Sequence, residues 1–459
     1  WAIWHEVLGT EAFGVLDHFF ELGGHSLTLT QVRSRIQQHF GIELPLADLF
    51  THLTLAELAT HIDQRQHPAS PADAIHAVSR SGLLPTSLSQ RRMWVIQHFH
   101  PESVAYNITA PVRLKGSFNL SLFERALDLL IARHEGLRTQ FVLRGEEPVQ
   151  IILPALRVQP DYRDLRSLNA SEREDAARQI ASALLAQPFD LSAAPLFRIS
   201  ILQMQDDEQV LLWVFHHAIA DNWALAVLSR ETLQIYAALL QGCTDPVDMG
   251  LAPLRTQYAD YAAWQRSAPV SAARESHLQA WRQKLDGLAD LPLPTDYPRP
   301  AQPSFLGHTI YAPLSEPLQR ALQSYGARHG VTPFMVLLAC FNVLLARLSR
   351  RTDIAVGTPI ANRHHAATEQ LVGTLVNTLV MRNTVEPQAT FDQLMLQVRA
   401  TALHAYAHQD APFDELVERL GAQRADHPQD LVRVLFNVLN APAGQLADVP
   451  FSYEAFDFD

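Results

Sequence analysis

Cysteine is scarce in this chain of 459 residues, which contains only Cys243 and Cys340. Because Cys340 lies in an apolar run, we expect no disulfide framework and predict a reducing, cytoplasmic compartment. Long hydrophobic runs are scarce as well. The longest, residues 334–348, is too short to span a bilayer and contains Asn342 and Arg347, so no membrane partner is predicted.

Positive charge is also in short supply. The chain has 36 basic and 48 acidic residues, which gives a formal net charge of -12. This balance argues against nucleic acid or an anionic membrane surface as a partner. The length exceeds what one hydrophobic core usually organises, so the sequence predicts a multidomain protein with one small and one large domain.

The small domain is predicted at residues 1–63 and is helical throughout. Apolar residues at helical spacing favour a helix over residues 26–40 that stops at Gly41, and a capping box from Thr54 to Glu57 starts another. Residues 64–81 are rich in Gln, His, Pro, Ala and Ser without an apolar period. This composition is typical of a semi-extended linker, which could reach about 60 Å if it were extended at ~3.1 Å per residue.

Strands and helices alternate beyond the linker, which predicts an α/β domain. A capping box from Ser121 to Glu124 indicates a helix, and a strand is expected at residues 139–143. Two apolar runs, residues 196–204 and 210–215, flank a polar segment and predict a hairpin. Further along, we expect a buried helix from Phe334 and a strand at residues 354–359.

The pattern His-His-x-x-x-Asp at residues 216–221 falls in a predicted strand-to-helix loop, where functional groups commonly lie. An imidazole at a strand end could accept or relay a proton near neutral pH, with Asp221 holding the loop through an arginine. A buried histidine held by backbone bonds is the plain alternative in a chain with 21 histidines. No third ligand at suitable spacing supports a metal site.

A second motif, Gly-Gly-His-Ser at residues 23–26, reads locally as a turn with a serine N-cap. Together with the preceding residues it forms Asp-x-Phe-Phe-Glu-Leu-Gly-Gly-His-Ser, which resembles the carrier proteins of nonribosomal peptide synthetases. The resemblance implies a four-helix carrier bundle whose first helix looks clipped at Trp1. It also implies a 4'-phosphopantetheine arm on Ser26, attached by a phosphopantetheinyl transferase, whose thiol holds an aminoacyl or peptidyl thioester.

Five segments of the large domain resemble successive signatures of the condensation domain of these synthetases. They occur in the expected order at residues 88–94, 133–139, 258–264, 372–378 and 408–414. The resemblance implies two lobes like chloramphenicol acetyltransferase, set in a V, with a tunnel that admits a pantetheine arm from each side. We expect the N-terminal lobe at residues 82–255 and the C-terminal lobe at residues 256–459.

The resemblance also suggests roles for individual residues. His217 would be central to amide formation, as a general base or as a stabiliser of the tetrahedral species, and His216 is the other catalytic candidate. Asp221 would be structural, with Arg138 as its expected ionic partner. Further tunnel or motif candidates are Asn222, Trp223, Asn377 and Gln409.

The chain departs from the family pattern at three places. Asn222 stands where the family usually has Gly, and it is a residue that also tolerates left-handed backbone geometry. The signature at residues 424–428 is degenerate, and no role is assigned there. The chain stops at Asp459 before the family's further strands and terminal helix, so the second lobe looks cut short.

The predicted function is peptide synthesis. The carrier would hold a donor thioester, and the condensation domain would transfer the acyl group to the amine on a downstream aminoacyl carrier, beside the adenylation domains of the same assembly line. An epimerisation domain is the first alternative, disfavoured by residues 90–94, by residues 376–378 and by His25, where carriers serving such domains tend to have Asp. A heterocyclisation domain is disfavoured because His216 and His217 stand where that subgroup has an Asp. A silent docking module is disfavoured by the intact His-His-x-x-x-Asp motif.

Overall fold

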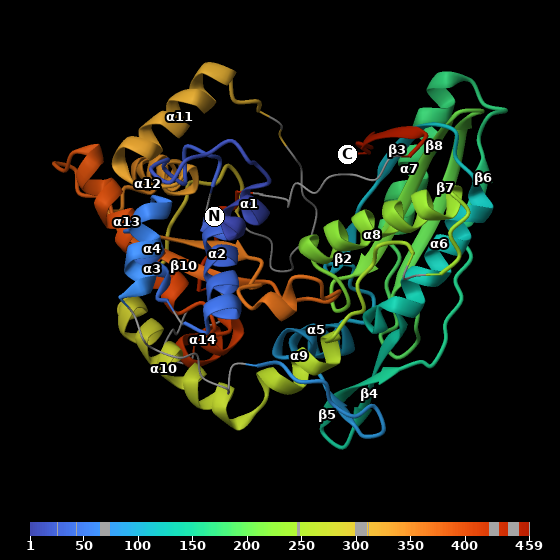
Figure 1. Cartoon of the computed structure of the whole chain (residues 1–459), viewed down its shortest axis with the longest axis horizontal. Helices are drawn as coiled ribbons and strands as arrows, with labels where there is room; N and C mark the ends of the chain where they lie inside the picture. Colours follow the sequence, from blue (N-terminus) through green and yellow to red (C-terminus); the bar gives the residue numbers. More distant parts are fainter. Residues whose placement is uncertain are drawn as a thin grey trace.

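The small domain is a bundle of four helices, drawn in blue in Figure 1. The computed structural model describes the chain except for residues 25, 43, 65–73, 246–247, 299–309, 311, 422–430, 439–448 and 459. His25, half of the predicted linker (residues 65–73) and the degenerate signature at residues 424–428 therefore lie outside the described residues. The four helices are α1 (Ala2–Leu8), α2 (Ser26–Phe40), α3 (Leu46–Leu49) and α4 (Leu55–Asp63).

Local capping explains where two of the predicted helices begin. The predicted capping box is present at α4, because the Thr54 hydroxyl accepts from Glu57 N at 3.3 Å and the Glu57 carboxylate accepts from Thr54 N at 3.1 Å. The helix predicted after Ser121 instead begins two residues earlier. Its N-cap is Asn119, whose side chain accepts from Leu122 N, so the Ser121 capping prediction was wrong.

A six-stranded sheet forms the N-terminal lobe, on the right in Figure 1. The central hairpin of β7 and β8 is the one predicted, and its pairing is antiparallel. The strand order is β11-β3-β8-β7-β6, with β2 also paired to β8, and only β6 and β7 are parallel among these pairs. The strands are β2 (Asn107–Thr109), β3 (Val112–Gly116), β6 (Asp161–Asp164), β7 (Phe197–Gln205), β8 (Glu208–His216) and β11 (Phe451–Ala455).

Strand β8 is buried along its whole length because helices cover both faces of the sheet. Leu211 and Trp213 belong to one core, which is shared with α6 (Leu120–Arg133) and α8 (Asn222–Leu240). Leu212 belongs to a second core on the other face, against α7 (Ala170–Leu185). This continuous apolar run ends at His216, so the histidine loop follows the C-terminal end of a central strand of the sheet.

The last strand corrects the predicted lobe boundary. Strand β11 pairs antiparallel with β3, so Tyr453 lies opposite Leu114 in the sheet of the N-terminal lobe. The predicted C-terminal lobe of residues 256–459 therefore does not hold as one unit, because residues 451–455 belong to the other lobe. A sheet edge exposes unpaired backbone groups, and β11 satisfies those of β3.

Helices dominate the C-terminal lobe, on the left in Figure 1. Two antiparallel strands, β9 and β10, lie within it, and α13 packs against β10. The elements are α9 (Tyr258–Gln265), α10 (Ala268–Leu285), α11 (Glu316–His329), α12 (Pro333–Ser349), β9 (Asp353–Ile360), η3 (Ala366–Thr368), β10 (Asn377–Thr384), α13 (Phe391–Ala407) and α14 (Phe413–Gly421).

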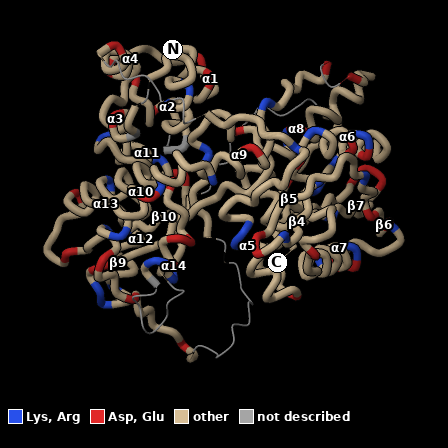
Figure 2. Tube along the Cα trace, turned by 90° about the horizontal axis from the view of Figure 1, so that it is seen from below, with Lys and Arg blue, Asp and Glu red and all other residues tan. Residues whose placement is uncertain are grey.

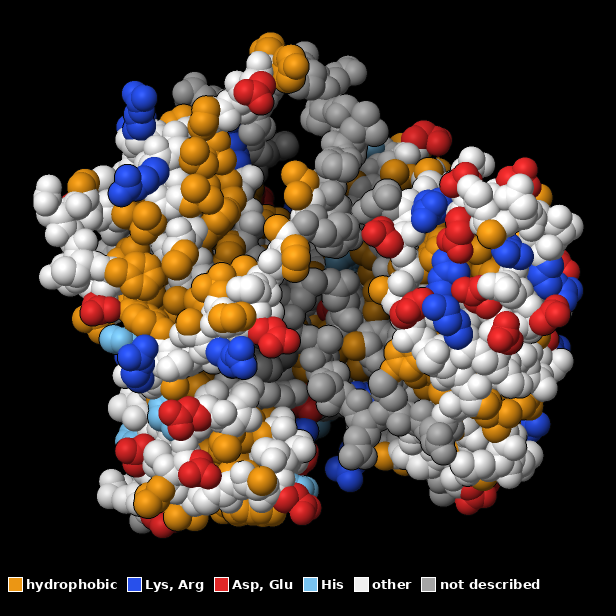
Figure 3. Space-filling model, turned by 90° about the horizontal axis from the view of Figure 1, so that it is seen from above, with side chains coloured by type: hydrophobic (Ala, Val, Ile, Leu, Met, Phe, Trp, Pro, Cys, Tyr) orange, Lys and Arg blue, Asp and Glu red, His pale blue; other side chains and the backbone are white. Residues whose placement is uncertain are grey.

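Helix α12 is the predicted buried helix from Phe334, but only one of its faces packs into the core. Thr332 caps it as expected, with its hydroxyl accepting from Met335 N at 3.3 Å. Its outer face nevertheless exposes Cys340, Leu344 and Leu348. Figure 3 shows hydrophobic side chains gathered on the outer surface of this lobe, whereas the corresponding surface of the N-terminal lobe is dotted with charges.

A smaller sheet lies at the junction of the two lobes. It is formed by β1 (Leu84–Pro85), β5 (Glu147–Ile152) and β4 (Thr139–Arg144), and the strand predicted at residues 139–143 is confirmed in β4. Helix α5 (Leu88–Phe99) follows β1, and the short helix η2 (Glu135–Arg138) precedes β4. Because α9 contacts both β1 and η2, the lobes meet here.

Acidic and basic residues are interspersed along the trace of both lobes (Figure 2). Within the described part of the chain, no single helix is long and apolar enough to cross a membrane. The pair α11 and α12 meets the length and composition criteria only when taken together, and its two helices meet at 105°.

Candidate active site at the lobe junction

His216 is the last residue of β8 and is almost fully buried, with 1% of its surface exposed. Its ring lies between the rings of Tyr106 and Phe189, and burial together with the neighbouring His217 lowers its pKa to about 3. The amide of Ala218 donates to its Nδ1 at 3.1 Å. His216 is therefore a neutral imidazole with its proton on Nε2, and it supports the loop from inside the lobe.

His217 is only partly buried, which separates it from its neighbour. Its backbone amide donates to the carbonyl of Tyr106 at 2.7 Å, which fixes the residue just beyond the end of β8. Its Nδ1 lies 3.3 Å from the hydroxyl oxygen of Thr374 in the C-terminal lobe. One ring nitrogen is thus held across the lobe junction, and the partly exposed ring is the one of the pair that a substrate can reach.

Asp221 is buried and clamps the other end of the loop. One of its carboxylate oxygens caps α8 by accepting from Ala224 N at 2.8 Å and also accepts from Arg363 Nη2 at 3.0 Å. The other oxygen accepts from Leu375 N at 2.9 Å. The carboxylate is therefore satisfied by donors from both lobes, as a buried charge requires.

The ionic partner of Asp221 is Arg363, so the prediction of Arg138 was wrong. Arg138 instead donates to the carbonyls of Ile131, Ala132 and Leu153, where it ties the end of α6 to the end of strand β5. Both arginines lie at or just after the end of a regular element, and nothing in the one-dimensional pattern ranks one above the other. The choice depends on which of them the fold brings across the lobe junction.

The motif at residues 372–378 supports the site by close packing. A Cβ atom on Gly373 would lie 1.8 Å from the ring of Tyr258, so only glycine fits there. The Tyr258 hydroxyl donates to the carbonyl of Thr374 at 2.5 Å and lies 2.8 Å from the Ser87 hydroxyl. The predicted signatures at residues 258–264 and 372–378 thus meet at Thr374, which contacts His217. Neither Thr374 nor Tyr258 was singled out from the sequence.

Two candidates beside Asp221 have different surroundings. Asn222 is the exposed first residue of α8 and has no positive φ angle, so the left-handed geometry considered for it is not used. Trp223 is 8% exposed, and its Nε1 donates to the carbonyl of Glu369 at 2.8 Å. Trp223 therefore joins the start of α8 to the C-terminal lobe.

Asn377 and Gln409 meet at the start of β10. The Asn377 amide donates to the carbonyls of Gln409 and Ala411, each at 2.8 Å, and its oxygen accepts from Phe413 N at 3.0 Å. Gln409 is 6% exposed. These contacts tie β10 to the start of α14, within the C-terminal lobe.

Comparison with known proteins bears on this arrangement directly. Residues 80–459 match the model of the condensation domain, and residues 2–62 match that of the phosphopantetheine attachment site. The chain belongs to the condensation-domain family. Its N-terminal bundle is a carrier of the phosphopantetheine-binding kind, so the predicted pairing of carrier and condensation domain is confirmed.

Curated relatives are large peptide synthases. Tyrocidine synthase 3 of Brevibacillus parabrevis is 38% identical over 459 residues, covering 99% of this chain and 7% of the relative. Gramicidin S synthase 2 of Aneurinibacillus migulanus is 36% identical over 439 residues, covering 95% of this chain and 9% of the relative. The chain thus spans less than a tenth of the length of either relative.

Solved structures confirm the two-lobed fold. The first condensation domain of the calcium-dependent antibiotic synthetase, in complex with a substrate analogue, has a TM-score of 0.67 at 19% identity and covers 82% of this chain and 85% of its own. The X-domain from teicoplanin biosynthesis has a TM-score of 0.70 at 24% identity and covers 84% of both chains. At these identities the likeness concerns the fold alone.

The carrier's attachment serine begins a helix that follows a glycine turn. Ser26 is the first residue of α2, a helix of 15 residues without an acidic residue in its first turn. The preceding turn is fixed because Gly23 has φ 89° and a Cβ on Gly24 would lie 2.3 Å from the Phe19 ring. A helix N-terminus stabilises a phosphate, so the residues present fit a phosphopantetheine arm at this point.

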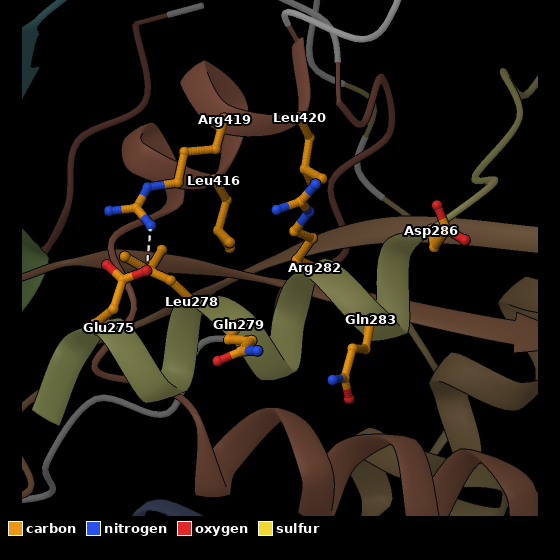
Figure 4. A pocket seen from close by; sticks show the side chains of 9 residues that line it. All are labelled: Glu275, Leu278, Gln279, Arg282, Gln283, Asp286, Leu416, Arg419 and Leu420. Atoms are coloured by element: carbon orange, nitrogen blue, oxygen red, sulfur yellow. Dashed lines mark hydrogen bonds and ion pairs between the residues drawn. The ribbon is translucent and has the colours of Figure 1, made fainter.

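No group of three or more His, Cys, Asp or Glu residues suited to a metal ion occurs among the described residues. A cavity of about 910 Å³ lies between α10 and α14 (Figure 4). It is lined by Leu278, Arg282 and Leu416, among others, and an ion pair of Arg419 with Glu275 crosses one end. None of its lining residues belongs to the histidine loop, so it is separate from the candidate site.

Proposed function

We propose that this chain forms an amide bond between a donor acyl group carried on Ser26 and the amine of an aminoacyl group on a downstream carrier. The observation that carries the proposal is the partly exposed His217 ring, held at Nδ1 by Thr374, beside the buried Asp221 clamp. The family match to a condensation domain and the carrier match at residues 2–62 support it.

The chemistry needs one proton transfer and one oxyanion. The acceptor amine attacks the thioester carbonyl carbon, the carbon–nitrogen bond forms, and the carbon–sulfur bond of the tetrahedral species breaks. The amine loses a proton and the departing thiolate takes one up, so no oxidant or reductant is consumed. The arm supplies the thioester, whereas the groups of this chain orient the reactants and handle the proton.

Two roles of His217 correspond to two tautomers. A general base needs a free lone pair on Nε2, in which case Nδ1–H donates to the Thr374 hydroxyl. A stabiliser of the oxyanion needs Nε2–H, in which case the Thr374 hydroxyl donates to Nδ1. The distance of 3.3 Å from Nδ1 to the hydroxyl oxygen is compatible with both, so a pH–rate profile must decide.

The proposed direction follows from domain order. Because the carrier precedes the condensation domain in the same chain, Ser26 is the donor station, and the acceptor carrier and adenylation domains are separate partners. Attachment of the arm requires a phosphopantetheinyl transferase. The proposed compartment is the cytoplasm, where the two cysteines of the sequence remain reduced.

A mass-transfer experiment tests this function. The full chain is loaded at Ser26 with an acyl arm and mixed with a purified carrier that bears an aminoacyl group. We expect the acyl mass to leave Ser26 and appear on the partner, and we expect retention of the thioester when the partner is omitted. Movement of the partner's group onto Ser26 would overturn the direction.

The same experiment separates the alternatives. A donor residue that returns with inverted configuration and unchanged mass would indicate epimerisation. A chain that is loaded normally but transfers nothing, with His217 intact, would indicate a docking module. Intact His216, His217 and Asp221 favour condensation over that last reading.

A further inference from the structure

A bidentate ion pair between Arg35 and Glu369 holds the carrier on the C-terminal lobe. The Arg35 guanidinium of α2 donates to both carboxylate oxygens of Glu369, at 3.0 and 2.7 Å. Both side chains are largely buried, with 17% and 14% of their surface exposed. Arg35 also contacts Glu6 of the carrier at 2.7 Å, but that glutamate is 53% exposed. The desolvated contact is thus the one that crosses between the domains.

A second contact secures the other side of the bundle. The ring of Phe50, which is 1% exposed, stacks on Tyr406 of α13 at 6.4 Å between ring centres. Arg399 of α13 donates both to the carbonyl of Phe50 at 3.0 Å and to that of Gly330 at 3.3 Å. The carrier and the C-terminal lobe consequently share one continuous hydrophobic core.

The segment that receives Arg35 also supports the active site. The backbone carbonyl of Glu369 accepts from Trp223 at 2.8 Å, at the start of α8. Arg363 donates to the carbonyls of Thr368 and Leu371 at 2.6 and 2.7 Å and binds Asp221 with its other nitrogen. Residues 366–374, here called the support segment, therefore run from the carrier contact to Thr374, which holds His217.

We propose that the support segment couples carrier docking to the catalytic loop: Arg35 binds Glu369 when the carrier docks, and this contact holds the segment in the position that orients Trp223, Asp221 and His217. Glu369 acts as a positioning residue through its neighbours and touches no substrate. The proposal rests on the proposed function for the role of His217, but the docking contact and its coupling are measurable without any reaction.

The attachment residue is separated from the docking contact along α2. Ser26 precedes Arg35 by nine residues on α2, which is about 14 Å along the helix axis at 1.5 Å per residue. Docking therefore engages the C-terminal half of α2 and keeps the attachment end clear of Glu369. Movement of the carrier away from this docking position would require the ion pair between Arg35 and Glu369 to break.

Hydrogen exchange on the full chain tests the proposal. Arg35→Glu should speed amide exchange in residues 366–372 about tenfold or more, because a desolvated contact is lost and like charges face each other. Glu6→Gln is the matched control, since it removes only the exposed partner of Arg35, and it should leave exchange within about twofold. The triple variant Glu6→Gln, Arg35→Glu, Glu369→Arg should restore slow exchange by reversing the pair.

The coupling has its own readout at the Trp223 indole. In protein labelled with ¹⁵N-tryptophan, its N–H signal, assigned with Trp223→Phe, should shift in Arg35→Glu and return in the triple variant. Unchanged exchange at residues 366–372 in Arg35→Glu would overturn the docking surface. Faster exchange there with an unmoved Trp223 signal would overturn the coupling.

Activity distinguishes failure of this inference from failure of the proposed function. A chain that forms no amide but shows the expected exchange pattern would refute the function and keep the docking contact. A chain that forms amide at the parent rate in Arg35→Glu, from the Ser26 thioester, would refute the coupling and keep the function.

Discussion

Arg363 and Asp221 form an ion pair that joins the two lobes, with 3.0 Å between Nη2 and Oδ1 and side chains 0% and 5% exposed. The carboxylate also accepts from Ala224 N and Leu375 N. One side chain therefore links the first turn of α8 in one lobe to the residues just before β10 in the other. The clamp fixes the loop that carries His217. Its removal is therefore expected to affect stability before chemistry.

Arg363→Met should lower the free energy of unfolding by about 3–5 kcal/mol, because it leaves a buried carboxylate without its partner. Arg138→Met is the matched control. It loses hydrogen bonds to neutral carbonyls at a partly exposed site but leaves no buried charge unpaired, so its loss should be smaller than that of Arg363→Met. Urea unfolding measures both. A larger loss in the Arg138 variant would contradict the assignment, and Asp221→Asn combined with Arg363→Met should recover stability if the unpaired charge is the cause.

The neutral state of His216 predicts a loss of stability in mild acid. Burial and His217 lower its pKa to about 3, below the value of about 6.5 in an unfolded chain, so the unfolded state binds the proton first. The contribution of neutral His216 to the free energy of unfolding is therefore complete above pH 6.5, and it falls as the pH drops toward 3. Between pH 6.5 and 4.5 the loss should reach about 2 kcal/mol.

The variant His216→Asn tests this linkage, since an amide oxygen replaces Nδ1 as acceptor for Ala218 N without gaining a charge. The difference between parent and variant stability should shrink by about 2 kcal/mol from pH 6.5 to 4.5. His365, whose pKa burial also lowers to about 3, remains in both proteins and cancels in the comparison. Parallel pH curves would show that His216 is not the titrating group.

Ser26→Ala should keep the fold but abolish attachment of the arm. The backbone of α2 already begins at this residue, so thermal unfolding should change little. Intact-mass measurement after treatment with a phosphopantetheinyl transferase gives the result, with the exposed Ser81→Ala as a control that still gains the arm. An arm on the Ser26 variant would show that another serine is modified.

His217→Ala should slow amide formation about 100- to 10,000-fold in single-turnover transfer from Ser26, because it removes the reachable imidazole. His216→Asn should slow it less, since that ring is enclosed by Tyr106 and Phe189. Carrier loading and melting temperature serve as controls for folding. Transfer at the parent rate by a folded His217→Ala protein would remove the assigned role.

Thr374→Val should slow the same transfer about five- to tenfold, the effect of one hydrogen bond of about 1 kcal/mol. Thr374→Ser keeps a hydroxyl for Nδ1 and should remain near the parent rate. Equal rates for the valine and serine variants would show that the hydroxyl does not position the ring.

The sequence by itself determined the local elements of this protein. The capping box at Thr54, the hairpin around residues 205–209 and the helix beginning at Pro333 depend on short-range hydrogen bonding and on apolar periodicity, which neighbouring residues fix. The motifs around Ser26 and His217 were specific enough to indicate the family. They identified chemistry because they lie in single short segments.

Tertiary structure alone decided which distant residues meet. Arg363 rather than Arg138 pairs with Asp221, β11 returns to the sheet of the first lobe, and Arg35 of the carrier meets Glu369. Each of these contacts joins residues more than a hundred positions apart, and their formation depends on how whole lobes pack. Local propensity carries no information about such pairings, since a buried charge takes whichever partner the folded backbone brings within hydrogen-bonding distance.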